Sequence, residues 1–371
     1  MGVTSPLRIA MIAEPRNPIP PLSDSSDYPQ MHHIANALVA SHHTVQVCAP
    51  GPSHCDARLV VTGAATAPQE PTSDRLQEHL LLSLESTRRF RADVIHDFTA
   101  QAGPMLSGFG IDVPLINHVS GEPSADRLRN LASTSLVSGL RQILVTDNPW
   151  LLDAVPDLQW HAAVRKPVAL TDCVFSSERL PYLVYDGPLD QGSRLGDLAT
   201  AAARMATTLK VISPVAHARE QAYVANCLAG LPDELQAVID FVTDPDTNAQ
   251  RRLLSRALAL LVPAAYTVRL QHTIGRALAS GTPAIVLGQV MAIEPALIEG
   301  VTAVTVGIDD VDSDTRTLID SLDPYDCRRV AAMEYSASRA ASHWESVYRG
   351  LLAQPVAPGA RASRRRQVGV T

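Results

Sequence analysis

The stretch LRIAMIA, residues 7–13, is a short apolar run ended by Glu-Pro-Arg, which is typical of a strand buried in a parallel sheet. A Pro-, Ser- and Asp-rich segment follows, and helical periodicity then appears over 31–41. A second apolar run, TVQVCA, covers 44–49. This order has about the length that a right-handed βαβ crossover needs, so the opening of the chain predicts a doubly wound α/β sheet.

Apolar runs and helical stretches alternate along the rest of the chain. The first half holds further predicted strands at 59–62, 94–96, 114–117 and 142–146, and a helix over 73–90. The second half holds predicted strands at 182–185, 208–212, 238–242, 259–262 and 284–287. Such alternation predicts two Rossmann-like α/β domains, whose ligands bind at the carboxyl ends of the strands.

The length of 371 residues suits two domains, because one domain typically takes about 150 residues. The segment 167–181 has no clear period and contains Pro, Ser and Thr, which makes it the best candidate for a linker. We therefore predict a first Rossmann-like domain over 1–175 and a second over 176–323. A C-terminal helix over 324–353 is expected to pack back on the first domain, and 354–371 to form a basic, disordered tail.

Charge and cysteine content exclude several classes of partner. The net charge of −7 gives no electrostatic reason to expect nucleic acid. The five cysteines are scattered, without a C-x-x-C pair or a histidine at zinc-ligand spacing, so we expect free thiols and no metal site. No run of 18 apolar residues occurs and no signal peptide is recognisable, so we predict a cytoplasmic protein without an integral membrane segment.

Eight stretches carry a resemblance to a known family. In the first half these are RIAMIAEPRNPIPP (8–21), ALVASHHTVQVCAP (37–50), ADVIHDFT (92–99) and VPLINHVSG (113–121). In the second half they are PYLVYDGPLDQG (181–192), LLSRALALLVPAA (253–265), RALASGTPAIV (276–286) and EGVT (299–302). In this order and spacing, the chain resembles glycosyltransferase family 4 over nearly its whole length apart from the tail.

The resemblance implies a fold of the GT-B type, in which two Rossmann-like domains face a cleft. It also implies retaining, metal-independent transfer of a glycosyl group from a nucleotide sugar to a small-molecule or glycan acceptor, with no cofactor. The C-terminal domain would take the donor and the N-terminal domain the acceptor. The leaving phosphate would serve as the base.

Several residues that the family uses to hold the donor are replaced in this chain. Pro188 and Gln191 stand where the resemblance implies an arginine and a lysine for the diphosphate, and Val268 and Arg276 where it implies an acidic pair. Ser120 stands in place of a histidine. These departures predict an eroded donor site. They leave open a catalytically inactive protein that acts as partner or regulator of an active glycosyltransferase, and an enzyme that binds an acidic small molecule through arginines.

The candidate site residues follow from the predicted strand ends and from the resemblance. The predicted catalytic residues are His118, Ser120 and His96. The predicted donor-binding residues are Gly187, Arg194, Arg269, Arg276, Gly281 and Thr282. For His118 the alternative is a hydrogen-bonded structural histidine, and for the arginines it is a solvated surface position or a structural ion pair.

Overall fold

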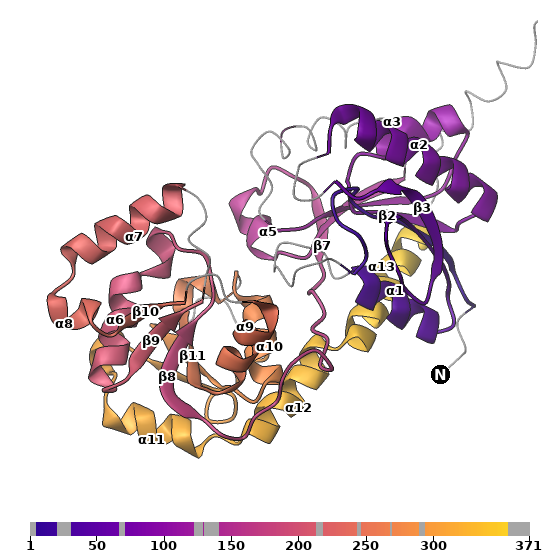
Figure 1. Ribbon diagram of the computed structural model, residues 1–371. Coiled ribbons are helices and arrows are strands. Elements are labelled where there is room, and N and C mark those ends of the chain that lie inside the picture. Colours follow the sequence, from indigo (N-terminus) through magenta and orange to yellow (C-terminus); the bar gives the residue numbers. More distant parts are fainter. Residues whose placement is uncertain are drawn as a thin grey trace, which may run out of the picture. The chain divides into compact units, whose positions relative to one another are not determined.

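The computed structural model describes residues 5–20, 31–66, 71–121, 129, 141–212, 218–242, 246–267, 269–288 and 294–354. The chain divides into two compact units, both visible in Figure 1. The first unit combines Met1–Pro167 with Ala337–Thr371, and the second is the continuous segment Val168–Ser336. The division between the units therefore falls before the predicted boundary at residue 175.

The first unit is built on a seven-stranded sheet with the order β3-β2-β1-β4-β5-β6-β7. Every recorded strand pair is parallel. The strands are β1 (Arg8–Ile12), β2 (Thr44–Gly51), β3 (Arg58–Ala64), β4 (Val94–Asp97), β5 (Leu115–Val119), β6 (Gln142–Thr146) and β7 (Trp160–Ala163). Its helices are α1 (Met31–Ala40), α2 (Ser73–Phe90), α3 (Gly103–Leu106), α5 (Trp150–Ala154) and α13 (Ala337–Ala353).

The second unit is built on a six-stranded parallel sheet with the order β10-β9-β8-β11-β12-β13. The strands are β8 (Leu180–Tyr185), β9 (Thr208–Val211), β10 (Ile239–Phe241), β11 (Ala257–Pro263), β12 (Ala284–Leu287) and β13 (Ala303–Val306). The helices are α6 (Leu195–Arg204), α7 (Ala218–Gly230), α8 (Asp233–Gln236), α9 (Thr247–Ser255), α10 (Gln271–Ala279), α11 (Ser313–Ser321) and α12 (Pro324–Tyr335).

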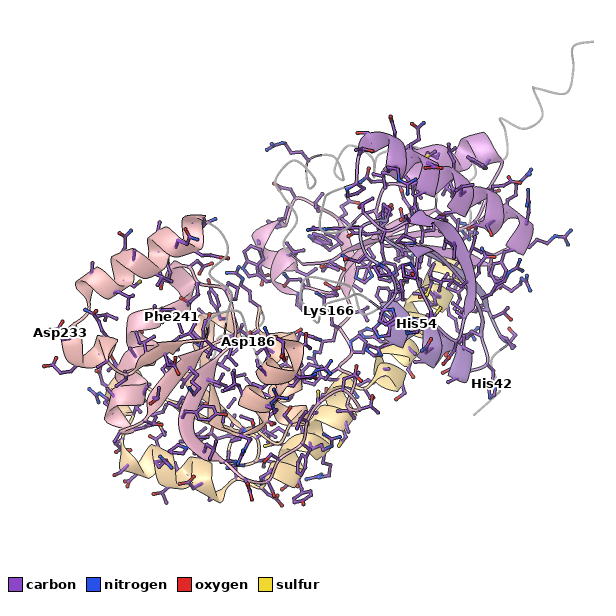
Figure 2. The ribbon with its side chains drawn as sticks, in the orientation of Figure 1. His42, His54, Lys166, Asp186, Asp233 and Phe241 are labelled. Carbon is purple, nitrogen blue, oxygen red and sulfur yellow. The ribbon has the colours of Figure 1, made fainter. Side chains whose placement is uncertain are left out.

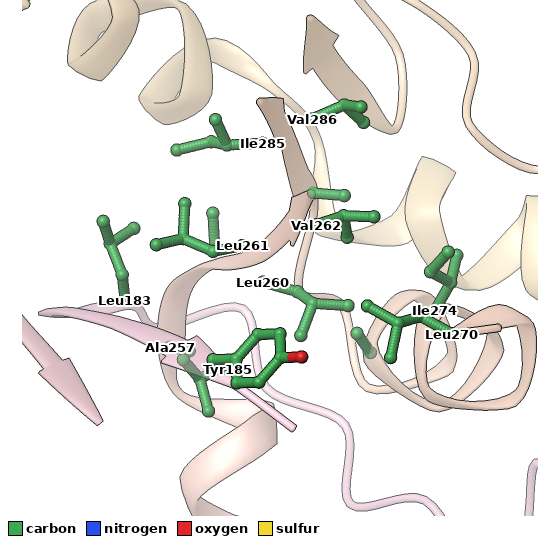
Figure 3. Packing of buried hydrophobic residues seen from close by; sticks show 14 of the residues in the cluster. Leu183, Tyr185, Ala257, Leu260, Leu261, Val262, Leu270, Ile274, Ile285 and Val286 are labelled. Atoms are coloured by element: carbon green, nitrogen blue, oxygen red, sulfur yellow. The ribbon is translucent and has the colours of Figure 1, made fainter. Parts of the chain in front are cut away.

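Each unit has its own hydrophobic core. In the second unit, Leu183, Leu260 and Ile285 of neighbouring strands are fully buried together with Ile274 of α10, as Figure 3 shows. In the first unit, the β1 side chains that face α1 pack into a cluster that also contains Trp344 of α13. The central strands of both sheets are buried on both faces, which explains why their sequences read as apolar runs rather than as alternating patterns.

The C-terminal helix predicted over 324–353 is two helices in the structure. Ser336 separates them, with an extended backbone at φ −62° and ψ 150°. The first helix, α12, packs against α10 in the second unit, whereas α13 packs against α1 in the first. The break is therefore the point at which the chain leaves one unit for the other.

Two further findings concern the described part of the chain. All five cysteines are free thiols. None of the described helices is both long enough and apolar enough to cross a membrane.

Candidate functional site

The strand order of the second sheet fixes where a ligand can be bound. From β8 the chain adds β9 and β10 on one side of this strand, and it then adds β11, β12 and β13 on the other side. The crevice between the carboxyl ends of β8 and β11 is therefore a topological switch point. The segments that leave these ends carry Asp186 to Asp190 and Ala264 to Leu270. Asp186 is labelled in Figure 2.

A polar cluster of Asp190, Tyr266 and Arg269 lies at this switch point. The Tyr266 hydroxyl donates a hydrogen bond to Asp190, whose other oxygen is 3.1 Å from the Arg269 guanidinium. Arg269 also donates to the Tyr266 oxygen at 2.7 Å and lies over the Tyr266 ring, 4.7 Å from its centroid. Burial alone would raise the pKa of Asp190, but the hydrogen bonds from Tyr266 and Arg269 lower it. The carboxylate is therefore held in its charged form, and it orients the arginine.

A second, looser pair lies beside the first. The Arg276 guanidinium, on α10, is 3.9 Å from the Asp186 carboxylate, and both side chains are largely buried. Burial raises the pKa of Asp186 by more than Arg276 lowers it. Arg269 and Arg276 thus both lie near the switch point, and each has an aspartate as partner.

Gly187 also lies at the switch point, but it is packed against the protein itself. A Cβ atom at this position would come within 2.5 Å of the Leu270 side chain and 2.8 Å of the Tyr185 hydroxyl. A Cβ at Gly192 would likewise meet the Tyr266 ring. These glycines are needed for internal packing around the polar cluster, whereas the prediction assigned Gly187 to the donor itself.

The remaining predicted donor residues lie elsewhere. The Arg194 side chain is 62% exposed and pairs with Asp197 at 2.6 Å. Arg194 is the N-cap residue of α6, and Asp197 lies in the first turn of the same helix. Gly281 and Thr282 precede β12 and therefore lie at the amino edge of the parallel sheet, opposite the switch point. Gly281 ends α10 with φ +90°, and the Thr282 hydroxyl donates to the carbonyl of Leu254. Both residues make structural contacts at this edge, and their predicted donor contacts stay a prediction.

The carboxyl edge of the first sheet carries a second polar group of residues centred on Asp147, directly after β6. The Ser120 hydroxyl donates to the Asp147 Oδ2 atom at 2.7 Å, and His118 Nε2 lies 3.3 Å from the same oxygen. Lys166, labelled in Figure 2, places its ammonium 3.7 Å from Oδ1. Burial would raise the pKa of Asp147, but Lys166, His118 and Ser120 together hold it at about 2.

His118 continues inward from this edge to His96. The two rings are joined by a 2.9 Å contact between His96 Nε2 and His118 Nδ1, and His96 Nδ1 is 2.9 Å from the Tyr348 hydroxyl of α13. Phe98 and Trp344 stack around both imidazoles, whose exposed fractions are 0% and 1%. Burial, followed by the neighbouring His118, lowers the pKa of His96 well below its usual range.

The structure therefore separates the three predicted catalytic residues. Ser120 is only half-buried and lies at the edge where a ligand can arrive. His96 and His118 are enclosed by aromatic side chains, so they act on their neighbours rather than on a ligand in this structure, which favours the structural alternative for His118.

Sequence reasoning missed Asp147, Lys166 and Tyr348. Asp147 follows a correctly predicted strand, so the rule that singled out His96 and His118 also applied to it. Lys166 and Tyr348 carry no local signal, because only the fold brings them to β4, β5 and β6. Among the described residues, no group of three or more histidine, cysteine or acidic side chains has the arrangement of a metal site.

Comparisons with solved structures agree with this architecture. AviGT4, a glycosyltransferase involved in avilamycin A biosynthesis, is 16% identical, with a TM-score of 0.62 over 94% of this chain and 98% of its own. Sucrose-phosphate synthase from Thermosynechococcus elongatus is 16% identical, with a TM-score of 0.59 over 94% and 99%. Anabaena HepE, in complex with UDP and glucose, is 11% identical, with a TM-score of 0.56 over 92% and 99%.

These identities are low, and the likeness is one of fold. No model of a protein family matches the chain, and no curated protein matches it either. The two parallel sheets with their helices have the GT-B fold of glycosyltransferases.

Proposed function

We propose that the protein transfers a glycosyl group from a nucleotide sugar to an acceptor, with the donor bound by the second unit. The observation that carries this proposal is the position of Arg269. This arginine lies at the switch point of a Rossmann-type sheet, directly before α10, in a chain with the fold of glycosyltransferases. HepE, which shares the fold, has been solved with UDP and with UDP-glucose.

The groups at this switch point suit the two ends of such a donor. A diphosphate carries about two negative charges and is bound well by arginine together with helix N-terminal amides. Among the described residues, no side chain caps α10, and its first turn contains no acidic residue. Asp190 and Asp186 supply carboxylates, which bind sugar and ribose hydroxyls. The site keeps the required chemistry with residues at new positions.

The donor site is nonetheless weaker than the resemblance implies. Pro188 and Gln191 provide no cation, and Val268 lies outside the described residues. Each missing charge-assisted contact typically costs about 1.5–3 kcal/mol. We therefore expect weak nucleotide binding, and we assign the acceptor to the carboxyl edge of the first sheet at Ser120, Asp147 and Lys166.

Calorimetric titration tests the proposal directly. The protein is titrated with UDP, GDP, ADP and TDP and with their sugars, and at least one is expected to bind. Arg269→Gln should then weaken binding about 10- to 100-fold, because it removes the charge directly before α10. Arg256→Gln is the matched control, since Arg256 is half-exposed, pairs with Glu178 and precedes β11 at the amino edge. Absence of binding by every nucleotide, or equal losses in the two variants, would contradict the proposal.

A second candidate function is a non-catalytic partner or regulator of an active glycosyltransferase. The observation that favours it is the pairing of the predicted donor-site arginines: Arg269 with Asp190, Arg276 with Asp186, and Arg194 with Asp197. An enzyme that binds an acidic small molecule through these arginines stays a prediction, which binding of a non-nucleotide acid in the same calorimetric titration would support. Co-purification of a glycosyltransferase supports the partner role, and turnover by the isolated chain excludes it.

A further inference from the structure

A buried series of four polar side chains, from Tyr348 to Asp147, joins four parts of the first unit. Tyr348 lies on α13, His96 on β4 and His118 on β5, and Asp147 follows β6. Successive polar atoms are 2.9, 2.9 and 3.3 Å apart. This series of side chains therefore links the C-terminal helix to the edge of the sheet at which the acceptor is proposed to bind.

Counting protons along this series of side chains leaves one arrangement in which each N–H or O–H faces an acceptor atom. A neutral imidazole has one N–H donor and one bare nitrogen acceptor. If the Tyr348 hydroxyl donates to His96 Nδ1, then His96 Nε2–H donates to His118 Nδ1, and His118 Nε2–H points at the Asp147 carboxylate. Each donor then faces an acceptor from one end of the chain to the other.

The reverse arrangement fails at both ends. His118 would donate from Nδ1 to His96, and its bare Nε2 would face the negatively charged Asp147 oxygen. His96 would donate to the Tyr348 oxygen, and the Tyr348 proton would have no acceptor, because among the described residues this hydroxyl is bonded only to His96. A buried donor without an acceptor is costly, as is a lone pair that faces a carboxylate.

We propose that Tyr348 is a positioning residue that acts through His96 to keep the proton of His118 on Nε2, directed at Asp147. Because Asp147 also accepts from Ser120 and pairs with Lys166, the chain fixes the polar groups at this edge. The connection to acceptor binding rests on the proposed function, whereas the proton arrangement does not depend on it.

Among the described residues, the titratable groups around His118 are His96, Asp147 and, beyond Asp147, Lys166. His96 faces it from β4, and Phe98 and Trp344 cover it with apolar rings. Asp147 faces it from the segment after β6, and Lys166, after β7, reaches it only through Asp147. The negative charge of Asp147 favours a proton on Nε2 of His118. Tyr348 determines which ring nitrogen of His96 carries the proton of that imidazole.

Nitrogen-15 NMR of the histidine-labelled full chain tests the proposal, because the two tautomers of imidazole have distinct ring-nitrogen shifts. In the wild type, both His96 and His118 are expected to carry their proton on Nε2 at neutral pH. In Tyr348→Phe, His96 loses its donor, so the preference for this order is reduced, although Asp147 still favours a proton on His118 Nε2. A fraction of His118 should then carry its proton on Nδ1 at neutral pH, which the ring-nitrogen shifts detect.

The matched control is Tyr325→Phe, which removes a hydroxyl from a side chain that is 63% exposed. Its histidine spectrum should equal that of the wild type. The proposal is overturned by Nδ1-protonated His118 in the neutral wild type, or by an unchanged spectrum in Tyr348→Phe. The wild-type measurement decides the matter alone if that variant does not fold. Nucleotide affinity should be unaffected by Tyr348→Phe, so a failure of nucleotide binding is a separate result that bears on the proposed function.

Discussion

Asp97 and Asp147 lie at the same edge of the first sheet and are both buried, yet their pKa values move in opposite directions. Burial raises the pKa of Asp97, even though its oxygens accept hydrogen bonds from Thr99 and from the backbone of Gln101 and Ala102. Burial would also raise the pKa of Asp147, but Lys166, His118 and Ser120 together reverse the effect. At Asp147 a nearby cation, together with His118 and Ser120, outweighs desolvation, whereas at Asp97 neutral hydrogen bonds do not.

This difference predicts how Asp147 contributes to stability. Its pKa is lowered from 3.8 to about 2 in the folded protein, so the contribution is present above pH 3.8 and is lost as pH falls toward 2. Asp147→Asn should reduce the free energy of unfolding by about 2–3 kcal/mol at neutral pH, and the difference from wild type should shrink below pH 4. Urea unfolding at several pH values measures it.

The control for this prediction is Asp153→Asn, at an exposed position on α5. Its free energy of unfolding should follow that of the wild type. A deficit of Asp147→Asn that is the same at pH 3 and pH 7 would show that the charge of Asp147 is not what stabilises the edge.

At the scale of elements, the strands that form the middle of each sheet were predictable and two edge strands were not. The apolar runs at 44–49, 94–96 and 284–287 correspond to β2, β4 and β12. The edge strands β7 (Trp160–Ala163) and β13 (Ala303–Val306) were missed. Edge strands are paired on one side only, so their side chains are less constrained to be apolar, and β7 is only partly buried.

The candidate site was less predictable than the fold, because its contacts join distant parts of the sequence. The Tyr348–His96 bond spans 252 residues, and Arg269 and Asp190 are 79 apart. Strand ends indicated His96 and His118, and the resemblance indicated Ser120, but no local pattern distinguishes a buried histidine from one that meets a ligand. Thr282 was inferred from a motif, and only the register of β11 and β12 shows that it lies at the other edge.

Helix α2 is attached to the first sheet through His79, and this attachment should depend on pH. His79 is buried, contacts the Thr62 hydroxyl at 2.6 Å and the Ala13 carbonyl at 2.7 Å, and burial lowers its pKa from 6.5 to about 4. Between these values the unfolded chain binds a proton that the folded protein does not. Stability should therefore fall by about 3 kcal/mol as pH decreases from 6.5 to 4.

His79→Gln separates this effect from the rest of the protein, because glutamine can hydrogen-bond but does not titrate. The stability of wild type relative to this variant, from urea unfolding, should decrease over that pH interval. His54→Gln, at the exposed position labelled in Figure 2, should retain the wild-type slope. An equal slope in wild type and His79→Gln would contradict the assignment.

At the scale of the whole molecule, the two units differ in how the chain builds them. The second unit is one continuous segment, whereas the first is completed by α13 from the far end of the sequence. Trp344, Tyr348 and Leu351 of α13 are fully buried in the core of the first unit. Where the chain enters and leaves the second unit, the backbone N–H of Val168 donates to the carbonyl of Tyr335 at 2.8 Å, so the two crossing segments lie side by side.

This arrangement predicts different behaviour for isolated fragments. The segment 168–336 contains its complete sheet and core, so it should fold alone and unfold cooperatively in urea. Residues 1–167 should not fold alone, because removal of α13 takes away Trp344, Tyr348 and Leu351 and exposes the apolar side chains that pack against them. Burial of each such aromatic or leucine side chain is worth about 1.5–3 kcal/mol. Joining Pro167 to Ala337 through a short Gly-Ser linker should restore folding, since Val168 and Tyr335 already lie within hydrogen-bond distance. Circular dichroism and urea titration of the three proteins distinguish these outcomes. Cooperative unfolding of residues 1–167 without α13 would show that the core of the first unit does not require this helix.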